Sequence, residues 1–462
     1  MNVVFKEWLP DLPELNNPGL IEASNVLPSD GGYTPFLPLN NAYGTAPAAV
    51  VGAFVCNGAT KGSSDVYVSA GLKYYKTNDT GPGPYTTLGS LTAGQFGVFT
   101  QIENIVFAAA GDAHKLAQNT IGSLSPFAAI TAAPYADAIG VVGQFLVAGG
   151  LYADAGAGTI EAIKSNYIQW SSIDQPLEWP TPGSDTAIAS QSGEQALYEQ
   201  NGPVFAIHGG DQYGLIFQRG AITRMTYIGG VAVFQFDLID NTQGLFYKNG
   251  SVKVGNLVYF ISSLGFCRTD GSQVQRIGEG KVDQHWFNNP GTNTVTCAWD
   301  AALGLVRFGN GSYVYHYNPN TGNWTVATQS HTFLITPAPN LGNRQYALGF
   351  NSSSPPILGI FAATAGSAVF TTGEFEPSPG GFSRIKGVKP LVADAATMTV
   401  AIGTRNDLNS SVSYTSEVTP TTRTGYSDFR SEARYMRARV TITGSFTKAV
   451  GIDALVEQSG NT

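Results

Sequence analysis

The sequence is poor in charge, and most of the charge that it has is negative. Charged residues make up 13% of 462 residues, and 25 basic against 33 acidic side chains give a formal net charge of −8. That charged share is about half of what soluble proteins usually carry. A protein that grips nucleic acid by neutralising many phosphates needs the opposite balance, so the composition argues against that class. A surface along which nucleic acid merely passes is not excluded.

Cysteines and long apolar runs are also scarce. The three cysteines, Cys56, Cys267 and Cys297, lie far apart in the sequence. We expect buried free thiols in a protein that folds in a reducing cytoplasm. No run approaches the ~20 apolar residues of a membrane span. Residues 1–8 lack the basic end and apolar core of a secretory signal, so we expect neither a membrane span nor such a signal.

No long segment has the 3.6-residue apolar period of a helix, and glycine and proline divide the chain instead. The stretch from Leu305 to Trp324 is typical: apolar runs at 305–308 and 313–317 are separated by the glycine-asparagine turn at 309–311. Short β-branched and aromatic runs around such turns predict antiparallel hairpins.

The same hairpin recurs about every 40 to 50 residues, a period typical of propeller blades. We count seven copies, which begin at residues 66, 105, 145, 204, 258, 305 and 346. A lone hairpin cannot bury both faces, whereas sheets stacked around an axis cover one another. The sequence therefore predicts an all-β fold with a β-propeller of six or seven blades, and a β-helix is disfavoured.

The ends of the chain differ from the repeats. Closely spaced prolines in residues 1–45 predict an extended N-terminal arm that covers its own chain or a neighbour, and we expect deletion of residues 1–40 to hinder assembly more than folding. Residues 46–375 form the predicted propeller, and residues 373–381 form a linker. Residues 382–462 predict an antiparallel β-sandwich or sheet, in which Met436, Ala438, Val440 and Ile442 share one face of a strand.

The sequence contains few residues in patterns typical of catalytic or ligand-binding sites, and we predict no catalytic, cofactor-binding or metal-binding residue. The histidines show no metal-ligand spacing among themselves or with cysteine; they are His114, His208, His285, His316 and His331. We expect His316 to be a packed or solvent-facing ring in a strand. Nucleophile elbow, Walker loop and dinucleotide fingerprint are absent from the sequence. Residues 172–179 resemble the aspartate-box turn of sialidase-type propellers, with Pro176 and Glu178 in place of the glycine and the threonine, and that turn is structural.

The densest cluster of charge consists of arginines near the C-terminus: Arg423, Arg430, Arg434, Arg437 and Arg439. Their forked donors could bind an acidic partner or phosphates. The alternative, which we favour, is an exposed strand face paired with nearby acids such as Asp428 and Glu432.

A set of short segments distributed along the chain is informative when taken together: residues 8–11 (WLPD), 17–20 (NPGL), 22–28 (EASNVLP), 31–35 (GGYTP), 167–171 (YIQWS) with Pro176 and Trp179, 250–260 (GSVKVGNLVYF), 402–406 (IGTRN), 424–425 (TG) and 434–439 (RYMRAR). These segments resemble the structural tail proteins of short-tailed bacteriophages, and in particular the tail nozzle. The resemblance spans most of the chain, and its motifs are structural.

This resemblance implies a homohexamer of propellers around a channel through which genomic DNA leaves the capsid. The ring would dock on the adaptor (head-to-tail connector) and portal, and it would hold tail fibres or spikes. It would reside in the virion tail after assembly in the bacterial cytoplasm, and it would not be an enzyme. Two alternatives stay open: a phage propeller that binds a receptor or degrades polysaccharide, and a cellular propeller scaffold that binds peptides.

Overall fold

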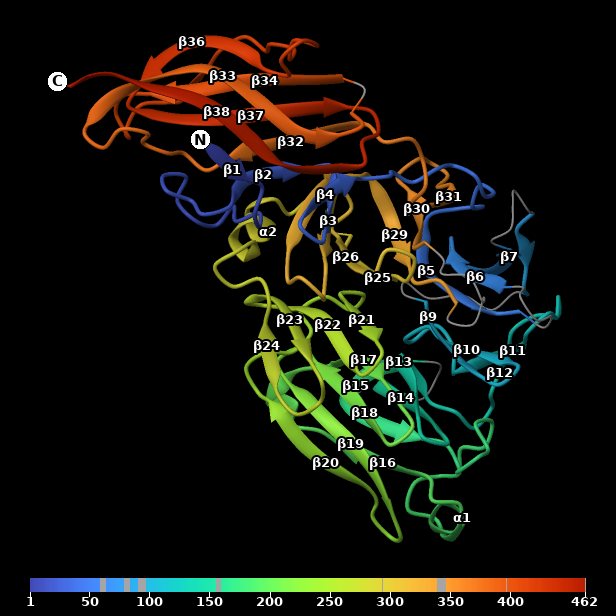
Figure 1. Cartoon of the computed structure of the whole chain (residues 1–462). Helices are drawn as coiled ribbons and strands as arrows, with labels where there is room; N and C mark the ends of the chain where they lie inside the picture. The colour runs from blue at the N-terminus through green and yellow to red at the C-terminus, as the bar shows by residue number, and fades with distance from the viewer. Residues whose placement is uncertain are drawn as a thin grey trace.

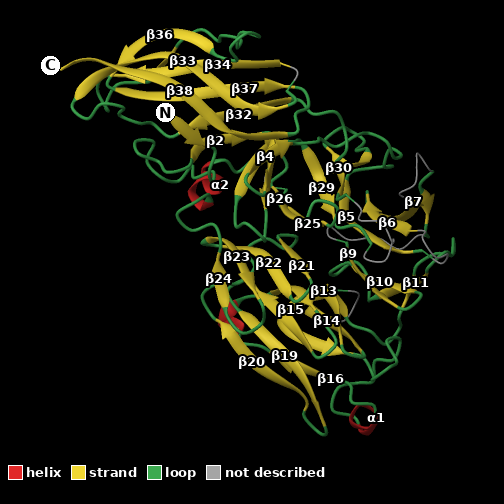
Figure 2. Cartoon of the chain, viewed as in Figure 1, coloured by secondary structure: helices red, strands yellow, loops and turns green. Residues whose placement is uncertain are grey.

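The structure is a computed structural model that describes residues 1–58, 64–78, 84–89, 97–154, 159–292, 294–338, 346–395 and 397–461. Nearly all of its regular secondary structure is β-sheet (Figure 1, Figure 2). In these ranges the helical elements are α1 (Asp185–Ala189), α2 (Asp283–Asn288) and a 3-10 turn at Glu199–Asn201. No helix among them is long and apolar enough to cross a membrane. The predicted all-β fold is confirmed.

Six four-stranded antiparallel units follow one another along the described chain, each in the order of its strands. Blade 1 consists of β5 (Val50–Asn57), β6 (Ser64–Ala70), β7 (Lys73–Asn78) and β8 (Thr86–Thr87). Blade 2 consists of β9 (Val98–Ile102), β10 (Ile105–Ala109), β11 (Ala117–Thr120) and β12 (Ala128–Ala129). Blade 3 consists of β13 (Tyr135–Val142), β14 (Phe145–Asp154), β15 (Ile160–Trp170) and β16 (Gly193–Ala196). Blade 4 consists of β17 (Val204–His208), β18 (Tyr213–Gln218), β19 (Ile222–Gly229) and β20 (Val233–Asp240). Blade 5 consists of β21 (Ser251–Val254), β22 (Leu257–Ser262), β23 (Gly265–Thr269) and β24 (Val274–Arg276). Blade 6 consists of β25 (Thr296–Asp300), β26 (Leu305–Gly309), β27 (Tyr313–Tyr317) and β28 (Trp324–Thr328).

A seventh blade closes the ring with help from the N-terminal segment. Its own strands are β29 (His331–Ile335), β30 (Leu348–Asn351) and β31 (Leu358–Ile360). Residues 39–46 run antiparallel to β31, with bridges from Leu39 to Phe361 and from Thr45 to Ile357. The Asn40 amide donates to the Ile360 carbonyl at 2.9 Å. The blade number that the sequence left open is therefore seven in the described structure.

The first strand of each blade is the innermost. Strands β5, β9, β13 and β17 lie side by side in this order, as do β21, β25, β29 and β5. A hydrogen bond between His208 and Ser251 joins β17 to β21. Buried apolar side chains fill the space between neighbouring blades. Phe217 of blade 4 and Phe260 of blade 5, for example, have ring centroids 5.2 Å apart. Each sheet thus covers the next, as the isolated hairpins require.

The C-terminal domain is a β-sandwich assembled from both ends of the chain. One sheet contains β3 (Val26–Ser29), β4 (Gly32–Pro35), β38 (Lys448–Asn461), β33 (Gly381–Ala393) and β36 (Ser427–Ala433), and β1 (Asn2–Val4) pairs with β38. The other contains β2 (Leu20–Ser24), β32 (Ser367–Thr372), β37 (Tyr435–Thr443), β34 (Thr397–Arg405) and β35 (Ser413–Tyr414). In Figure 1 the blue N-terminal strands lie between the orange and red domain and the propeller.

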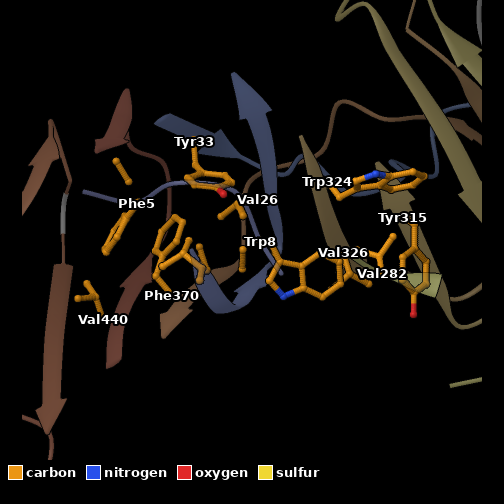
Figure 3. Close-up of a cluster of buried hydrophobic side chains, with 14 of the residues drawn as sticks. Phe5, Trp8, Val26, Tyr33, Val282, Tyr315, Trp324, Val326, Phe370 and Val440 are labelled. Atoms are coloured by element: carbon orange, nitrogen blue, oxygen red, sulfur yellow. The ribbon is translucent and has the colours of Figure 1, made fainter. Parts of the chain in front are cut away.

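Aromatic side chains of the N-terminal segment lie in the core that joins the two domains (Figure 3). Phe5 stacks on Phe370 with centroids 4.7 Å apart. Trp8 is 1% exposed and lies between Phe370 on the sandwich side and Val326 on the propeller side. The Tyr33 hydroxyl donates to the Lys6 carbonyl. Because these rings are buried, the segment is part of the core.

A single sheet continues from blade 6 into the sandwich. Strand β2 pairs with β32 on one side and bridges in parallel to β28 on the other, at Ser24 and Val326. Asn25 follows at φ 58°, a conformation that asparagine tolerates better than most residues. Its side chain donates to the Ser367 carbonyl and accepts from the Thr328 amide, both at 2.9 Å. Backbone pairing therefore connects the two domains directly.

The arm of residues 1–45 lies on its own chain, one of the two alternatives expected for it, as β1–β4 and the last strand of blade 7. We therefore expect its deletion to impair folding before assembly, which reverses the expectation from the sequence. Two domain boundaries also differ from the sequence-based prediction. Strand β32 lies inside the predicted propeller range 46–375 but pairs with β37 of the sandwich. The predicted linker 373–381 includes Glu374, which is 1% exposed, and Phe375, which bridges to Met436. Its glycines and prolines mark a connection within the sandwich.

Candidate functional site

The innermost strands of all seven blades surround a cavity of about 890 Å³. Its wall is mixed: apolar side chains such as Phe54, Ile139 and Phe205 alternate with polar ones such as Gln101 and Glu103. Glycines let these strands approach closely: a Cβ added to Gly209 would lie 1.5 Å from the Val141 carbonyl oxygen. The volume lies in the range of small-ligand pockets.

Polar groups gather on the blade 4 and blade 5 side of this cavity. His208 Nε2 lies 2.8 Å from Ser251 Oγ, and Lys253 Nζ donates to the Gly209 carbonyl. Burial, and secondarily the charge of Lys253, lowers the pKa of His208 to about 4. Lys248 Nζ forms an ion pair with Asp137 Oδ2 at 2.8 Å.

The His208–Ser251 pair has the spacing of a base and a nucleophile, but its surroundings favour a structural role. A general base works best with a pKa near the operating pH, and a pKa of about 4 is too low for that. In the catalytic arrangement a third group orients the base. Among the described contacts no carboxylate bonds to His208. We interpret the pair as a hydrogen bond that ties blade 4 to blade 5.

Three other histidines also form hydrogen bonds between elements. His114 Nε2 lies 2.8 Å from the Tyr74 hydroxyl, and His285 Nδ1 lies 2.8 Å from the Tyr315 hydroxyl. His331 Nε2 accepts from the Gly311 amide at 3.3 Å. Burial lowers the pKa of all three. In the described part of the chain no three residues of the types His, Cys, Asp or Glu are placed to hold a metal ion.

His316 is a packed ring, one of the two alternatives expected for it. It belongs to a buried charged group within blade 6. Arg307 donates to Asp300 Oδ2 from Nη2 at 2.7 Å and from Nε at 3.0 Å. Its Nη1 lies 3.2 Å from His316 Nδ1, and its guanidinium lies 4.1 Å from the centre of the Phe361 ring. Asp300, Arg307 and His316 are each 0% exposed. The only sequence signal was an arginine inside an otherwise apolar strand.

Residues 172–179 form a compact turn between β15 and α1. The Ser172 amide donates to the Glu178 carbonyl at 2.9 Å, and the Glu178 amide donates to the Gln175 carbonyl at 3.0 Å. Trp179 is 3% exposed and packs between blades 2 and 3. These hydrogen bonds and the packing of Trp179 agree with a structural turn.

Free thiols are found as the sequence suggested, with one difference. Cys56 and Cys267 are buried, and burial raises the pKa of each to about 12. Cys297 is only half-buried. Thiols with raised pKa values are unreactive, which agrees with a structural role.

The predicted arginine cluster divides into two groups, and its acidic partners differ from those expected. Arg423 and Arg430 are exposed. Arg434 pairs with Glu376 at 2.9 Å, Arg437 with Glu14 at 2.8 Å, and Arg439 lies 3.9 Å from Glu22. Glu432 pairs with Arg384 instead. The expectation of pairing with Asp428 and Glu432 was therefore wrong, because two of the partners belong to the distant N-terminal segment.

Arg437 and Arg439 line a second cavity, of about 410 Å³, at the junction of the N-terminal segment, blade 6 and the sandwich. We call it the arginine cleft. Its lining residues are Trp8, Pro10, Leu12, Glu14, Ile21, Glu22, Ser24, His285, Val326, Thr371, Tyr414, Arg437 and Arg439. The sequence signalled its arginines but not the cleft, since the walls come from segments hundreds of residues apart.

Comparisons with known proteins add little to the geometry. No family model matches the chain, and no curated protein matches it. Solved structures that resemble it include PorZ, a surface component of the type-IX secretion system of Porphyromonas gingivalis (8% identity, 72% of this chain, TM-score 0.41). Virginiamycin B lyase of Staphylococcus aureus (12%, 71% of this chain and 95% of the lyase, TM-score 0.35) and the AfRom2 CNH domain (7%, 71% and 98%, TM-score 0.40) are further examples. The chain spans 42% of the length of PorZ.

Proposed function

We propose that this protein is a structural subunit of a bacteriophage tail, the nozzle, and that several copies form a ring through which genomic DNA passes. The observation that carries the proposal is the sheet shared by blade 6 and the sandwich. This sheet connects the two domains without a flexible linker, and buried aromatic side chains of the N-terminal segment pack against it. A subunit of a channel wall needs such a rigid connection between its two ends.

The cavity sizes bear on where DNA would pass. A cavity of about 890 Å³ suits a small ligand and is far too small for a DNA duplex. Any passage for DNA must therefore lie between subunits, which requires a ring of several copies. The net charge of −8 agrees with such a wall, because an acidic surface repels a polyanion.

Exposed apolar side chains provide a candidate subunit contact. Tyr227, Ile228 and Val231, at the tip of the β19–β20 hairpin, are 39%, 54% and 95% exposed, and Ile188 of α1 is 61% exposed. Both elements lie at the end of the molecule opposite the C-terminal domain (Figure 1). Exposed apolar residues gathered in one region are typical of protein contacts.

The experiment that tests the proposal is the oligomeric state, measured by mass photometry and by electron microscopy, alone and with the adaptor ring. We expect a ring, and we expect V231S to weaken it without lowering the melting temperature. L124S is the matched control, since Leu124 is 65% exposed on blade 2, away from the hairpin. A protein that stays monomeric with its adaptor ring would contradict the proposal.

A polysaccharide-degrading phage propeller is the second candidate, and nothing in the central cavity favours it. Most glycoside hydrolases use two carboxylates. Among the described lining residues only Glu103 carries one. If the protein releases reducing sugar from host polysaccharide and E103Q abolishes this release, the protein is an enzyme and the structural proposal is wrong.

A further inference from the structure

The arginine cleft contains donor groups without acceptors. Arg437 is 8% exposed, and its Nε has no hydrogen-bond partner among the described residues. Its Nη1 forms an ion pair with Glu14 Oε1 at 2.8 Å but no hydrogen bond. Arg439 Nε and the Tyr414 hydroxyl are likewise buried and unpartnered within the described part of the chain. Buried donors of this kind are costly, so they indicate a missing acceptor.

Of the two arginines in the cleft, Arg439 lies farther from a carboxylate that could balance its positive charge. Its Nε lies 3.9 Å from Glu22 Oε2, and that oxygen already accepts from Thr371 Oγ1 at 2.7 Å. The Arg439 guanidinium lies 3.9 Å from the centre of the Tyr414 ring. A guanidinium held against an aromatic ring keeps its N–H groups available at its edge, where a planar acceptor can meet them.

The charges of the cleft restrict the acceptor. Glu14 and Glu22 line it together with the two arginines, so the lining groups are neutral in sum. In a lining that is neutral in sum, a second negative charge on the ligand gains no net attraction, because repulsion from the glutamates rises with attraction to the arginines, and it adds to the cost of removing the ligand from water. A carboxylate has one charge and two oxygens, and it can accept from an arginine fork.

We propose that the arginine cleft binds a carboxylate group, with Arg439 and Tyr414 as its principal donors and Arg437 beside them. The cavity of about 410 Å³ has room for an acidic side chain of a partner protein or for a small free carboxylate. The chemistry is the same in both cases. The inference does not depend on the proposed function, because ring assembly is a separate measurement.

The test uses the full-length protein at pH 7 and constant ionic strength. The probes are sodium acetate, a capped peptide with one aspartate, inorganic phosphate and, as reference, sodium chloride. Titration calorimetry and the ligand-dependent rise in melting temperature give the affinity. We expect saturable binding of acetate, of the peptide or of both. Binding of the peptide without binding of acetate would indicate that the natural carboxylate belongs to a side chain of a partner protein. In R439Q the affinity should fall by about tenfold or more, since a hydrogen bond to a charged group is lost.

Two further variants separate binding from structure. Y414F removes one oxygen and should weaken binding by roughly threefold to tenfold while the melting temperature without ligand stays the same. R430Q removes an exposed arginine from β36 and should bind as the wild type does. The proposal fails if neither carboxylate probe binds above chloride, if phosphate binds more tightly than both, or if Y414F and R439Q bind like the wild type.

Discussion

The propeller and the C-terminal domain are both antiparallel, but they differ in how far along the chain their partners lie. In blade 6, Leu305–Gly309 pairs with Tyr313–Tyr317 across a short turn. In the sandwich, Val3 pairs with Ile452, and the N-terminal amine donates to the Ala454 carbonyl at 2.7 Å. A blade therefore forms from neighbouring residues, whereas the sandwich needs the two ends of the chain. The N-terminal segment serves both, because residues 39–46 complete blade 7.

Deletion of residues 1–40 is expected to have the largest effect. It removes β1–β4 and leaves the space of Phe5, Trp8 and Tyr33 in the shared core unfilled. Each large aromatic lost from a core costs about 3–5 kcal/mol, so the loss of three is comparable to the whole stability of a typical domain, about 5–15 kcal/mol. We expect insoluble protein, or a chain whose C-terminal residues are cut rapidly by protease.

The control is V4S, at an exposed position of β1, which should be soluble and as resistant as the wild type. A soluble deletion variant with the wild-type melting temperature would show that the sandwich stands without the N-terminal segment.

The next largest effect should distinguish a buried ion pair of the propeller from an exposed pair of the sandwich. D300N leaves the fully buried Arg307 without its carboxylate, and we expect a loss of about 3–5 kcal/mol in the free energy of unfolding. E432Q removes the partner of Arg384, where both side chains are more than 40% exposed, and should cost less than about 1 kcal/mol. Urea unfolding of both variants measures the difference. Equal losses would contradict the role assigned to burial.

Acid should weaken the propeller, because all five histidines lie in or beside it. Burial lowers the pKa of His208 and of His331 to about 4, while the unfolded chain keeps a value near 6.5. Between these pH values the unfolded state binds more protons, so the free energy of unfolding falls as the pH falls from about 6.5 towards 4.

Asp283 acts in the opposite direction. Burial raises its pKa to about 6, so the folded state gains a proton below that pH before the unfolded chain does, and stability from this group falls as the pH rises from about 4 to 6. We expect a net loss of roughly 2 kcal/mol between pH 7 and pH 5. Urea unfolding at both pH values should show a smaller loss for the H208Q/H331Q variant than for the wild type. Unchanged stability of the wild type at pH 5 would contradict this account.

The same difference in sequence distance explains what could be predicted from the sequence. The hairpins of the propeller were visible because a strand, its turn and its partner are adjacent. The buried face of β37 was visible because Met436, Ala438, Val440 and Ile442 alternate with polar residues, and all four are buried.

Strands β1, β3 and β4 of the N-terminal segment were missed because their partners are far away in the sequence and because closely spaced prolines argued against strands. Pro28 lies in β3, which is the edge strand of its sheet, a position where the missing amide does no harm. The arginine cleft was missed for the same reason. The glutamates near Arg437 and Arg439 are Glu14 and Glu22, more than 400 residues earlier in the chain.

Hydrogen–deuterium exchange can establish whether β2 joins the propeller to the sandwich. We expect a peptide covering residues 20–25 to exchange as slowly as one covering residues 324–328, because β2 pairs with β32 and bridges to β28. Exchange of residues 20–25 as fast as that of the exposed tip at residues 228–232 would contradict it.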